Sequence, residues 1–296
     1  MNKVSFGEFE LCTEFSDALA KQGVTDSFPV QDQSFPAIYG EQDFVLKAPT
    51  GTGKTLAFLL PALSRIVENE GESLLVLAPS PELAMQIVRV AESLLESFPI
   101  KPIALISSAS LERQRENLRK SDARVVVATP GRACDLIESK HLKSTQYSTL
   151  VLDESDTIMQ TENADLINFL LSSLRADCQL IMASATITEA SLDFADEYMR
   201  DNYVKVDGVG RLSEIEFPYV FCGEGKKEIM LSKLIVEKKL DKVLVFVNSL
   251  NYTDHVREFL GKQGVVAVSI NKDDDKVDRQ QAIDDFTSGK ARALKV

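Results

Sequence analysis

The sequence has no long hydrophobic run: no stretch approaches the roughly 18 consecutive apolar residues of a membrane-spanning helix. The first residues, Met1–Glu8, lack the charged-then-apolar pattern of a signal peptide. We therefore expect an intracellular protein, of the nucleus, the nucleolus or the cytoplasm, with no membrane partner.

Cysteine and histidine are scarce. The four cysteines lie far apart and show no paired spacing of the kind that binds zinc, and the two histidines are isolated: Cys12, Cys134, Cys178, Cys222, His141 and His255. This spacing excludes a zinc-finger framework and argues against disulfides, so we expect reduced thiols. It also argues against a histidine-based catalytic site.

Basic charge is in deficit. The chain carries 33 basic and 45 acidic residues, a net charge of −12, and residues 217–296 hold 14 of the basic and 12 of the acidic ones. The acidic excess therefore lies in residues 1–216. A sequence-specific nucleic-acid reader normally shows a basic stripe, which is missing. Any nucleic-acid contact should use backbone N–H groups and helix N-termini, with weak counterion release.

The segment 48–55, Ala-Pro-Thr-Gly-Thr-Gly-Lys-Thr, has the pattern of a phosphate-binding loop. It follows the apolar run 44–46 and precedes a helix-like apolar stretch, although the generic pattern begins with glycine rather than Ala48. Gly51 and Gly53 allow successive backbone N–H groups to turn toward one anion. The N-terminus of the following helix adds further donors. The segment predicts a nucleoside triphosphate site.

Charged side chains complete this predicted site. Lys54 can reach the β- and γ-phosphates, and the hydroxyl of Thr55 can ligate Mg²⁺. A second apolar run, 149–152, delivers Asp153 and Glu154 at its end. In phosphoryl-transfer ATPases one such carboxylate holds the metal and a neighbour orients or deprotonates the attacking water. We assign these roles to Asp153 and Glu154.

Short apolar runs alternate with helical patterns along the chain. They lie at 44–46, 74–78, 103–106, 125–128, 149–152, 180–183, 204–206, 218–221, 243–247 and 265–270. This alternation predicts an α/β fold, a parallel sheet with helices on both faces. Ligands of such sheets bind at the carboxyl ends of the strands, where the two motifs fall.

The length of 296 residues fits two domains. We expect a first domain over 1–206, which holds the nucleotide motifs. The stretch 207–216 is glycine-containing and has no apolar periodicity, so it predicts a linker. Residues 217–296 then form a partial second domain.

The order of motifs resembles that of the DEAD-box ATP-dependent RNA helicases along nearly the whole chain. The segments that carry this resemblance are Phe28–Gln31, the loop 48–55, Pro79–Ala84, Thr129–Arg132, Asp153–Asp156, Ser184–Thr186, Val245–Ser249, and Arg279 with Phe286 and Gly289. The resemblance implies a RecA-like sheet domain followed by a partial second RecA-like domain.

The same resemblance implies a role for each matched residue. The ATP-binding residues would be Phe6, which stacks on adenine, Gln31, which reads its edge, and Thr50, Gly51, Thr52, Gly53, Lys54 and Thr55. The catalytic residues would be Lys54, Asp153 and Glu154, with Mg²⁺ on Thr55 and Asp153. The RNA-binding residues would be Pro79, Glu82, Thr129, Pro130, Gly131, Arg132 and Arg279. Ser184 and Thr186 would couple the ATP state to domain movement.

Several positions depart from the family pattern. Pro81 stands in place of an arginine, Ser107 and Ser108 in place of a glycine pair, and Thr157 in place of a basic residue. The acidic motif has Ser155 instead of alanine. These changes remove cationic charge and backbone freedom from the segments expected to contact RNA.

The printed sequence ends at 291–296, which resembles the strand that leads into the fifth helicase motif. The fifth motif and the arginine-rich sixth motif are not in it. We therefore expect slow ATP hydrolysis and no duplex unwinding from these residues alone. We also expect this last strand, near Ala293–Val296, to be an unpaired sheet edge that leaves the second domain loosely folded or prone to association.

The implied function is that of an ATP-dependent RNA helicase, an ATP hydrolase that uses ATP and Mg²⁺ to clamp or locally unwind RNA. Contacts would go to sugar and phosphate, with little sequence specificity. We expect a monomer, and protein cofactors are compatible with this function. The acidic composition leaves one alternative open: an acidic ATP-binding adaptor or scaffold without helicase activity.

Overall fold

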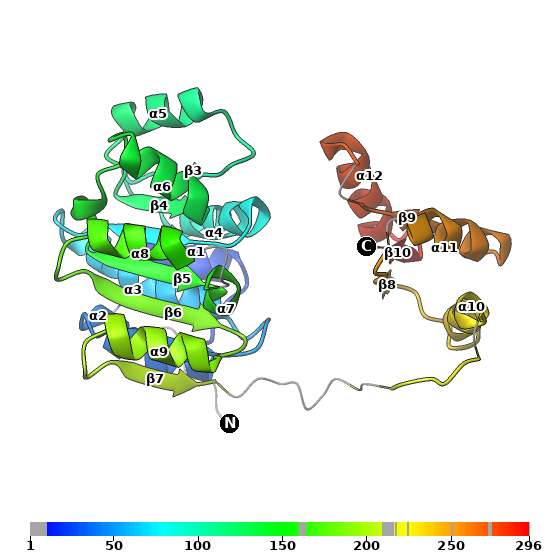
Figure 1. Cartoon of the computed structure of the whole chain (residues 1–296). Coiled ribbons are helices and arrows are strands. Elements are labelled where there is room, and N and C mark those ends of the chain that lie inside the picture. Colours follow the sequence, from blue (N-terminus) through cyan, green and yellow to red (C-terminus); the bar gives the residue numbers. More distant parts are fainter. Residues whose placement is uncertain are drawn as a thin grey trace. The chain divides into compact units, whose positions relative to one another are not determined.

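The computed structural model describes residues 11–159, 164–208, 216, 218–223, 225–249, 251–271 and 274–295. The chain divides into two compact units, Met1–Ile215 and Glu216–Val296. The division falls within the stretch 207–216. Each unit has its own sheet and its own apolar core, and each is described by itself (Figure 1).

The first unit is built on a seven-stranded sheet in the order β3-β4-β2-β5-β6-β1-β7. Its strands are β1 Phe44–Lys47, β2 Leu74–Leu77, β3 Ile103–Leu105, β4 Val125–Ala128, β5 Thr149–Asp153, β6 Gln179–Ser184 and β7 Val204–Asp207. Every neighbouring pair is parallel. The central strands read as unbroken apolar runs because both of their faces are covered.

Helices cover both faces of this sheet (Figure 1). They are α1 Thr13–Lys21, α2 Pro29–Tyr39, α3 Lys54–Glu68, α4 Pro81–Leu94, α5 Leu111–Lys120, α6 Pro130–Glu138, α7 Ser155–Ile158, α8 Ala164–Ser173 and α9 Glu189–Tyr198, with a short 3₁₀ turn, η2 Ser144–Gln146. The first four pack into one apolar core and α5 to α9 contribute to the other.

Alternate residues of each strand enter the two cores. In β2, Leu74 and Val76 belong to the core under α1 to α4, and Leu75 and Leu77 belong to the opposite core. This is the two-residue periodicity of a strand that is buried on both sides. The predicted parallel sheet with helices on both faces is therefore confirmed.

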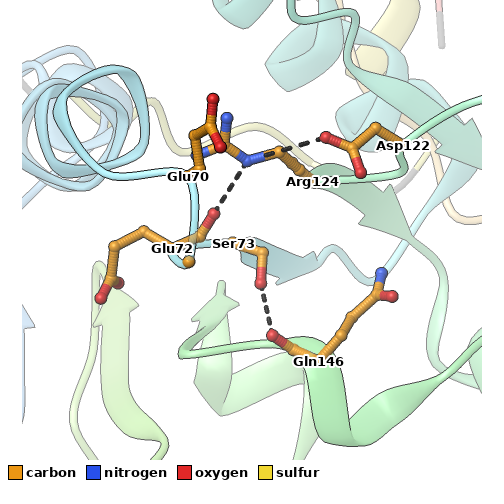
Figure 2. Close-up of a pocket in the computed structure, with 7 residues that line it drawn as sticks. Glu70, Glu72, Ser73, Asp122, Arg124 and Gln146 are labelled. Carbon is orange, nitrogen blue, oxygen red and sulfur yellow. Dashed lines mark hydrogen bonds and ion pairs between the residues drawn. The ribbon is translucent and has the colours of Figure 1, made fainter.

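A polar pocket of about 130 Å³ lies at the amino ends of the strands (Figure 2). The guanidinium of Arg124 donates from Nε to the carbonyl of Glu72 at 3.1 Å and lies 3.9 Å from the carboxylate of Asp122. The hydroxyl of Ser73 donates to the carbonyl of Gln146 at 2.6 Å. These groups precede β2, β4 and β5, so the pocket lies at the edge opposite to the predicted nucleotide loop.

The second unit has a three-stranded parallel sheet in the order β8-β10-β9. Its strands are β8 Val243–Val245, β9 Ala267–Ser269 and β10 Ala293–Lys295, and its helices are α10 Lys227–Glu237, α11 Asn251–Lys262 and α12 Lys276–Thr287. Its small core contains Ile235, Val256, Leu260, Val265 and Ala293.

Two expectations about this second unit are wrong. The apolar run 218–221 does not form a strand, and Tyr219 and Phe221 are 82% and 90% exposed. The last strand, β10, is not an unpaired edge, because it lies between β8 and β9 and pairs with both. Sequence order alone suggested an edge, whereas a crossover connection placed the final strand at the centre.

None of the helices in the described part of the chain is both long enough and apolar enough to span a bilayer.

A pair of neighbouring residues on α4 tests the packing of the first unit. Ile87 is fully buried and Gln86 is exposed. We expect Ile87→Ala to lower the free energy of unfolding by about 2–5 kcal/mol, through lost burial and a residual cavity. The matched change Gln86→Ala should stay within about 0.5 kcal/mol of the unmutated chain. Urea denaturation followed by circular dichroism measures both, and equal effects would contradict the assigned helix face.

Candidate active site

Most of the predicted motif segments of the first unit lie at one edge of its sheet. The loop 48–55 follows β1, and Asp153 ends β5. Ser184 ends β6, which lies between β5 and β1. Because all strands are parallel, their carboxyl ends meet at this edge (Figure 1). The fold therefore brings together residues that are more than a hundred positions apart in the sequence.

The loop 48–55 adopts the backbone that its glycines allow. Gly51 and Gly53 have φ values of 78° and 85°, in the left-handed region that glycine enters at little cost. Gly53 is the N-cap of α3, so Lys54 is the first residue of the helix. The hydroxyl of Thr52 donates to the carbonyl of Pro49 at 2.7 Å and braces the loop internally.

Gln31 is built into this loop. It is 2% exposed, its carboxamide oxygen accepts from the backbone N–H of Phe28 at 2.9 Å, and its Nε2 donates to the carbonyl of Gly53 at 3.1 Å. A Cβ added at Gly53 would lie closer than 3.0 Å to that nitrogen. Gln31 thus ties the start of α2 to the phosphate loop. Phe6, its predicted companion at the adenine, lies outside the described residues.

Lys54 is held between the loop and the acidic motif. Its ammonium donates to the carbonyl of Ala48 at 2.6 Å. Burial lowers the pKa of Lys54, while the charges of Asp153, Glu154 and Asp156 act in the opposite direction. A half-buried cation in this position is stabilised by the carboxylates and is available to phosphate oxygens.

Asp153 is the most buried carboxylate of the acidic motif, at 3% exposure. Burial raises the pKa of Asp153 to about 6, although a hydrogen bond from the N–H of Glu154 at 3.1 Å acts against this rise. Glu154 itself has a left-handed backbone, φ 50°, as the N-cap of α7. Its side chain therefore leaves the strand in a different direction from that of Asp153.

Asp156 links the acidic motif to the end of β6. The hydroxyl of Thr186 donates to its carboxylate, and the N–H of Thr186 donates to the hydroxyl of Ser184 at 3.3 Å. Burial would raise the pKa of Asp156, but hydrogen bonds from the Ser184 and Thr186 hydroxyls outweigh it and lower the pKa. Between these acids, the hydroxyl of Ser155 is buried without a hydrogen-bond partner among the described residues.

The segment after β2 begins α4. The hydroxyl of Ser80 caps the helix by accepting from the N–H of Leu83 at 3.2 Å, and Pro81 occupies the first helical position. Proline is well suited to that position, which has no intrahelical N–H partner. Proline at position 81, where the family has arginine, is therefore compatible with the start of α4, but it supplies no positive charge beside Pro79. Glu82 is exposed in the first turn.

Arg132 points onto a neighbouring loop. Its guanidinium donates to the carbonyl of Ala109 at 3.2 Å and to that of Ser107 at 3.3 Å, and its side chain is 11% exposed. Thr129 donates its N–H to the carbonyl of Leu105 at 3.0 Å, while its buried hydroxyl has no partner among the described residues. Pro130 and Gly131 open α6 between them.

Sequence reasoning missed Gln114 on α5. It is buried and donates from Nε2 to the carbonyl of Ile106 at 2.8 Å, so it fixes the beginning of the loop that Arg132 holds further along. A glutamine in a helix of charged residues gives no signal of this role.

Arg279 lies on α12 of the second unit and donates to the carbonyl of Asn271 at 3.1 Å. The site residues described above all belong to the first unit.

A family model described as DEAD/DEAH box helicase matches residues 28–194, more than half of the chain. The chain belongs to this helicase family. Related proteins can be aligned with most of the length of this chain. It is 33% identical to the DEAD-box ATP-dependent RNA helicase CshC of Bacillus cereus, over 94% of this chain and 71% of that protein. It is 32% identical to the ATP-dependent RNA helicase DBP2 of Encephalitozoon cuniculi, over 98% of this chain and 60% of that protein.

Solved structures resemble the fold. The structure of a DEAD box protein from Methanococcus jannaschii matches with a TM-score of 0.67 and 26% sequence identity. The match covers all of the present chain and 80% of the Methanococcus chain. Dbp5 of Saccharomyces cerevisiae, bound to RNA and ADP BeF3, matches with a TM-score of 0.80 and 24% identity, over 98% of this chain and 75% of that chain. The predicted RecA-like fold is confirmed.

The buried carboxylate of Asp153 predicts a pH-dependent cost of folding. Its folded pKa of about 6 exceeds the ordinary 3.8, so the unfolded chain loses this proton first and stability falls as pH rises through that interval. In EDTA, we expect Asp153→Asn to raise the free energy of unfolding by on the order of 2 kcal/mol above pH 6, and to have no effect below pH 3.8.

Asp156→Asn is the matched control, because the pKa of Asp156 is lowered rather than raised. It should destabilise the chain at neutral pH by weakening the hydrogen bond from Thr186. Denaturant unfolding over a range of pH measures both variants. A stabilising Asp156→Asn, or a destabilising Asp153→Asn, would contradict these charge environments.

Proposed function

We propose that the chain is an ATP-dependent RNA helicase that binds Mg·ATP on its first unit. One observation carries this proposal: in a chain of the DEAD/DEAH box helicase family, the ammonium of Lys54 lies on the phosphate loop within the field of Asp153, Glu154 and Asp156. The relatives CshC and DBP2 are named as ATP-dependent RNA helicases, which supports the same function here.

In this function the backbone N–H groups of residues 50–55 and the ammonium of Lys54 hold the triphosphate. The hydroxyl of Thr55 and the carboxylate of Asp153 would hold a Mg²⁺ ion, which would supply positive charge to the phosphates. The donors fit this ion because magnesium takes one or two carboxylates and completes its coordination with phosphate and water.

We assign to Glu154 the role of orienting or deprotonating the attacking water. It is adjacent to Asp153, yet its left-handed backbone directs its side chain elsewhere. One carboxylate can therefore serve the metal and the other the water, as phosphoryl transfer requires. The bond from Thr186 to Asp156 connects this chemistry to Ser184 at the end of β6, and we assign to this link the coupling of ATP state to movement.

RNA contacts in this proposal go to sugar and phosphate. The backbone N–H of Gly131 supplies a donor, and Pro79, Glu82, Thr129 and Pro130 shape the neighbouring surface. With few cations at this edge, we expect weak, salt-sensitive binding with little sequence preference. Arg279 would add a contact from the second unit. A monomeric state and a nuclear, nucleolar or cytoplasmic location stay predictions.

An acidic ATP-binding adaptor remains the second candidate, favoured by the net charge of −12 and by Pro81 in place of a cation. The two functions differ in whether ATP binding and RNA binding affect each other. In a helicase, Mg·ATP changes the affinity for single-stranded RNA, whereas an adaptor binds ATP without that change.

Lys54→Ala tests the nucleotide site. We expect ATP affinity to fall by at least about 100-fold, because the variant loses a charge-assisted contact to the phosphates. Titration calorimetry with Mg·ATP measures the loss, and thermal unfolding checks that the fold is intact. Lys21→Ala is the control, since that lysine is exposed and pairs with Glu96 on the surface. Undiminished affinity in Lys54→Ala would contradict the site.

Gln31→Ala tests base choice. The unmutated chain should bind ATP more tightly than GTP by about tenfold, the scale of one discriminating hydrogen bond. The variant should lose this preference and bind both nucleotides more weakly, since Gln31 also holds the carbonyl of Gly53. Gln33→Ala, on the exposed side of the same helix, should change neither. Equal ATP and GTP affinities in the unmutated chain would rule out adenine reading.

A further inference from the structure

The chain leaves the sheet of the first unit beside the phosphate loop. The last strand, β7, pairs with β1 in a register that sets Asp207 opposite Lys47, and the two side chains lie 3.7 Å apart. The next residue, Gly208, donates its N–H to the carbonyl of Lys47 at 2.6 Å. Lys47 directly precedes Ala48, so the exit from the sheet runs alongside the beginning of the loop.

Gly208 has no room for a side chain. A Cβ at this position would lie closer than 3.0 Å to Cγ1 of Val30, 2.9 Å from Cβ of Ala48 and 3.3 Å from the carbonyl of Lys47. Its φ lies outside the left-handed region, so the requirement for glycine is one of space. Val30 adjoins Gln31, and Ala48 begins the phosphate loop. The exit therefore touches both segments that shape the nucleotide site.

Ala48 carries this contact into the site. It is fully buried, its N–H donates to the carbonyl of Ser184 at 2.9 Å, and its carbonyl accepts from the ammonium of Lys54. The generic loop has glycine at this position, whereas here a methyl group fills the space next to Gly208. The two positions are complementary, since one supplies the methyl and the other leaves room for it. A displaced Gly208 would displace the backbone that Lys54 is bound to.

We propose that Gly208 is a positioning residue for the nucleotide loop. Its close contact with Ala48 joins the backbone that leads to the second unit to the loop that holds Lys54, so that the two move together. Binding of nucleotide stiffens this joint, and a change in the exit path alters nucleotide affinity. The inference rests on the proposed binding of ATP at the loop 48–55.

Gly208→Ala tests whether the contact between Gly208 and Ala48 positions the nucleotide loop. Overpacking a close-packed site strains its neighbours, and we expect the dissociation constant for Mg·ATP to rise by about tenfold or more in titration calorimetry. Gly71→Ala is the matched control, because a Cβ there meets only the side-chain oxygen of Asn69, at 3.3 Å, at the opposite edge of the sheet. That control should bind Mg·ATP as the unmutated chain does.

A second variant separates positioning from a general loss of stability. Val30→Ala removes the atom closest to the added methyl, so Gly208→Ala with Val30→Ala should recover most of the affinity relative to Val30→Ala alone. In the unmutated chain, Mg·ATP should also slow hydrogen exchange at the N–H of Gly208 more than at that of Gly71.

These measurements distinguish failure of the inference about Gly208 from failure of the proposed ATP binding. If Gly208→Ala lowers the melting temperature yet binds Mg·ATP with unchanged affinity, or if ATP does not slow exchange at Gly208, the joint is ordinary packing and the inference fails alone. If the unmutated chain binds no Mg·ATP, the proposed function fails and the inference fails with it.

Discussion

The interaction on which the candidate site depends is the placement of one half-buried cation. Lys54 is partly desolvated, which lowers its pKa, and it is held by the carbonyl of Ala48 and the field of three carboxylates. Asp153 ends β5, Glu154 and Asp156 follow it, and Lys54 begins α3 directly after the loop that leaves β1. The parallel sheet, with β6 between β5 and β1, brings these charges to one edge.

Several backbone positions around this cation admit few alternatives. Gly53 combines a positive φ with the close approach of Gln31, and Gly208 leaves space for the methyl group of Ala48. Glu154 takes a left-handed conformation without being glycine. Non-glycine residues in that region are uncommon and cost free energy, which the surrounding structure must offset. The backbone at this edge is thus constrained by steric fit as well as by hydrogen bonds.

The sequence predicted the sheet, the loop and the acidic motif because those signals are local: apolar runs, glycine spacing, and acids at a strand end. It could not predict contacts that arise only on folding. The bonds of Arg132 to Ser107 and Ala109, and the packing of Gln31 on Gly53, require distant segments to meet. For the same reason the sequence wrongly predicted β10 at the edge of its sheet, whereas the strand lies at the centre. The role of Phe6 remains a prediction.

A crystal structure of the chain with Mg²⁺ and a non-hydrolysable ATP analogue tests the central claim most directly. The proposed site predicts phosphates on the backbone N–H groups of the loop 48–55, with the ammonium of Lys54 transferred from the carbonyl of Ala48 to a phosphate oxygen. It also predicts Mg²⁺ beside Thr55 and Asp153. A nucleotide bound elsewhere, with Lys54 still on the carbonyl of Ala48, would contradict the proposed site.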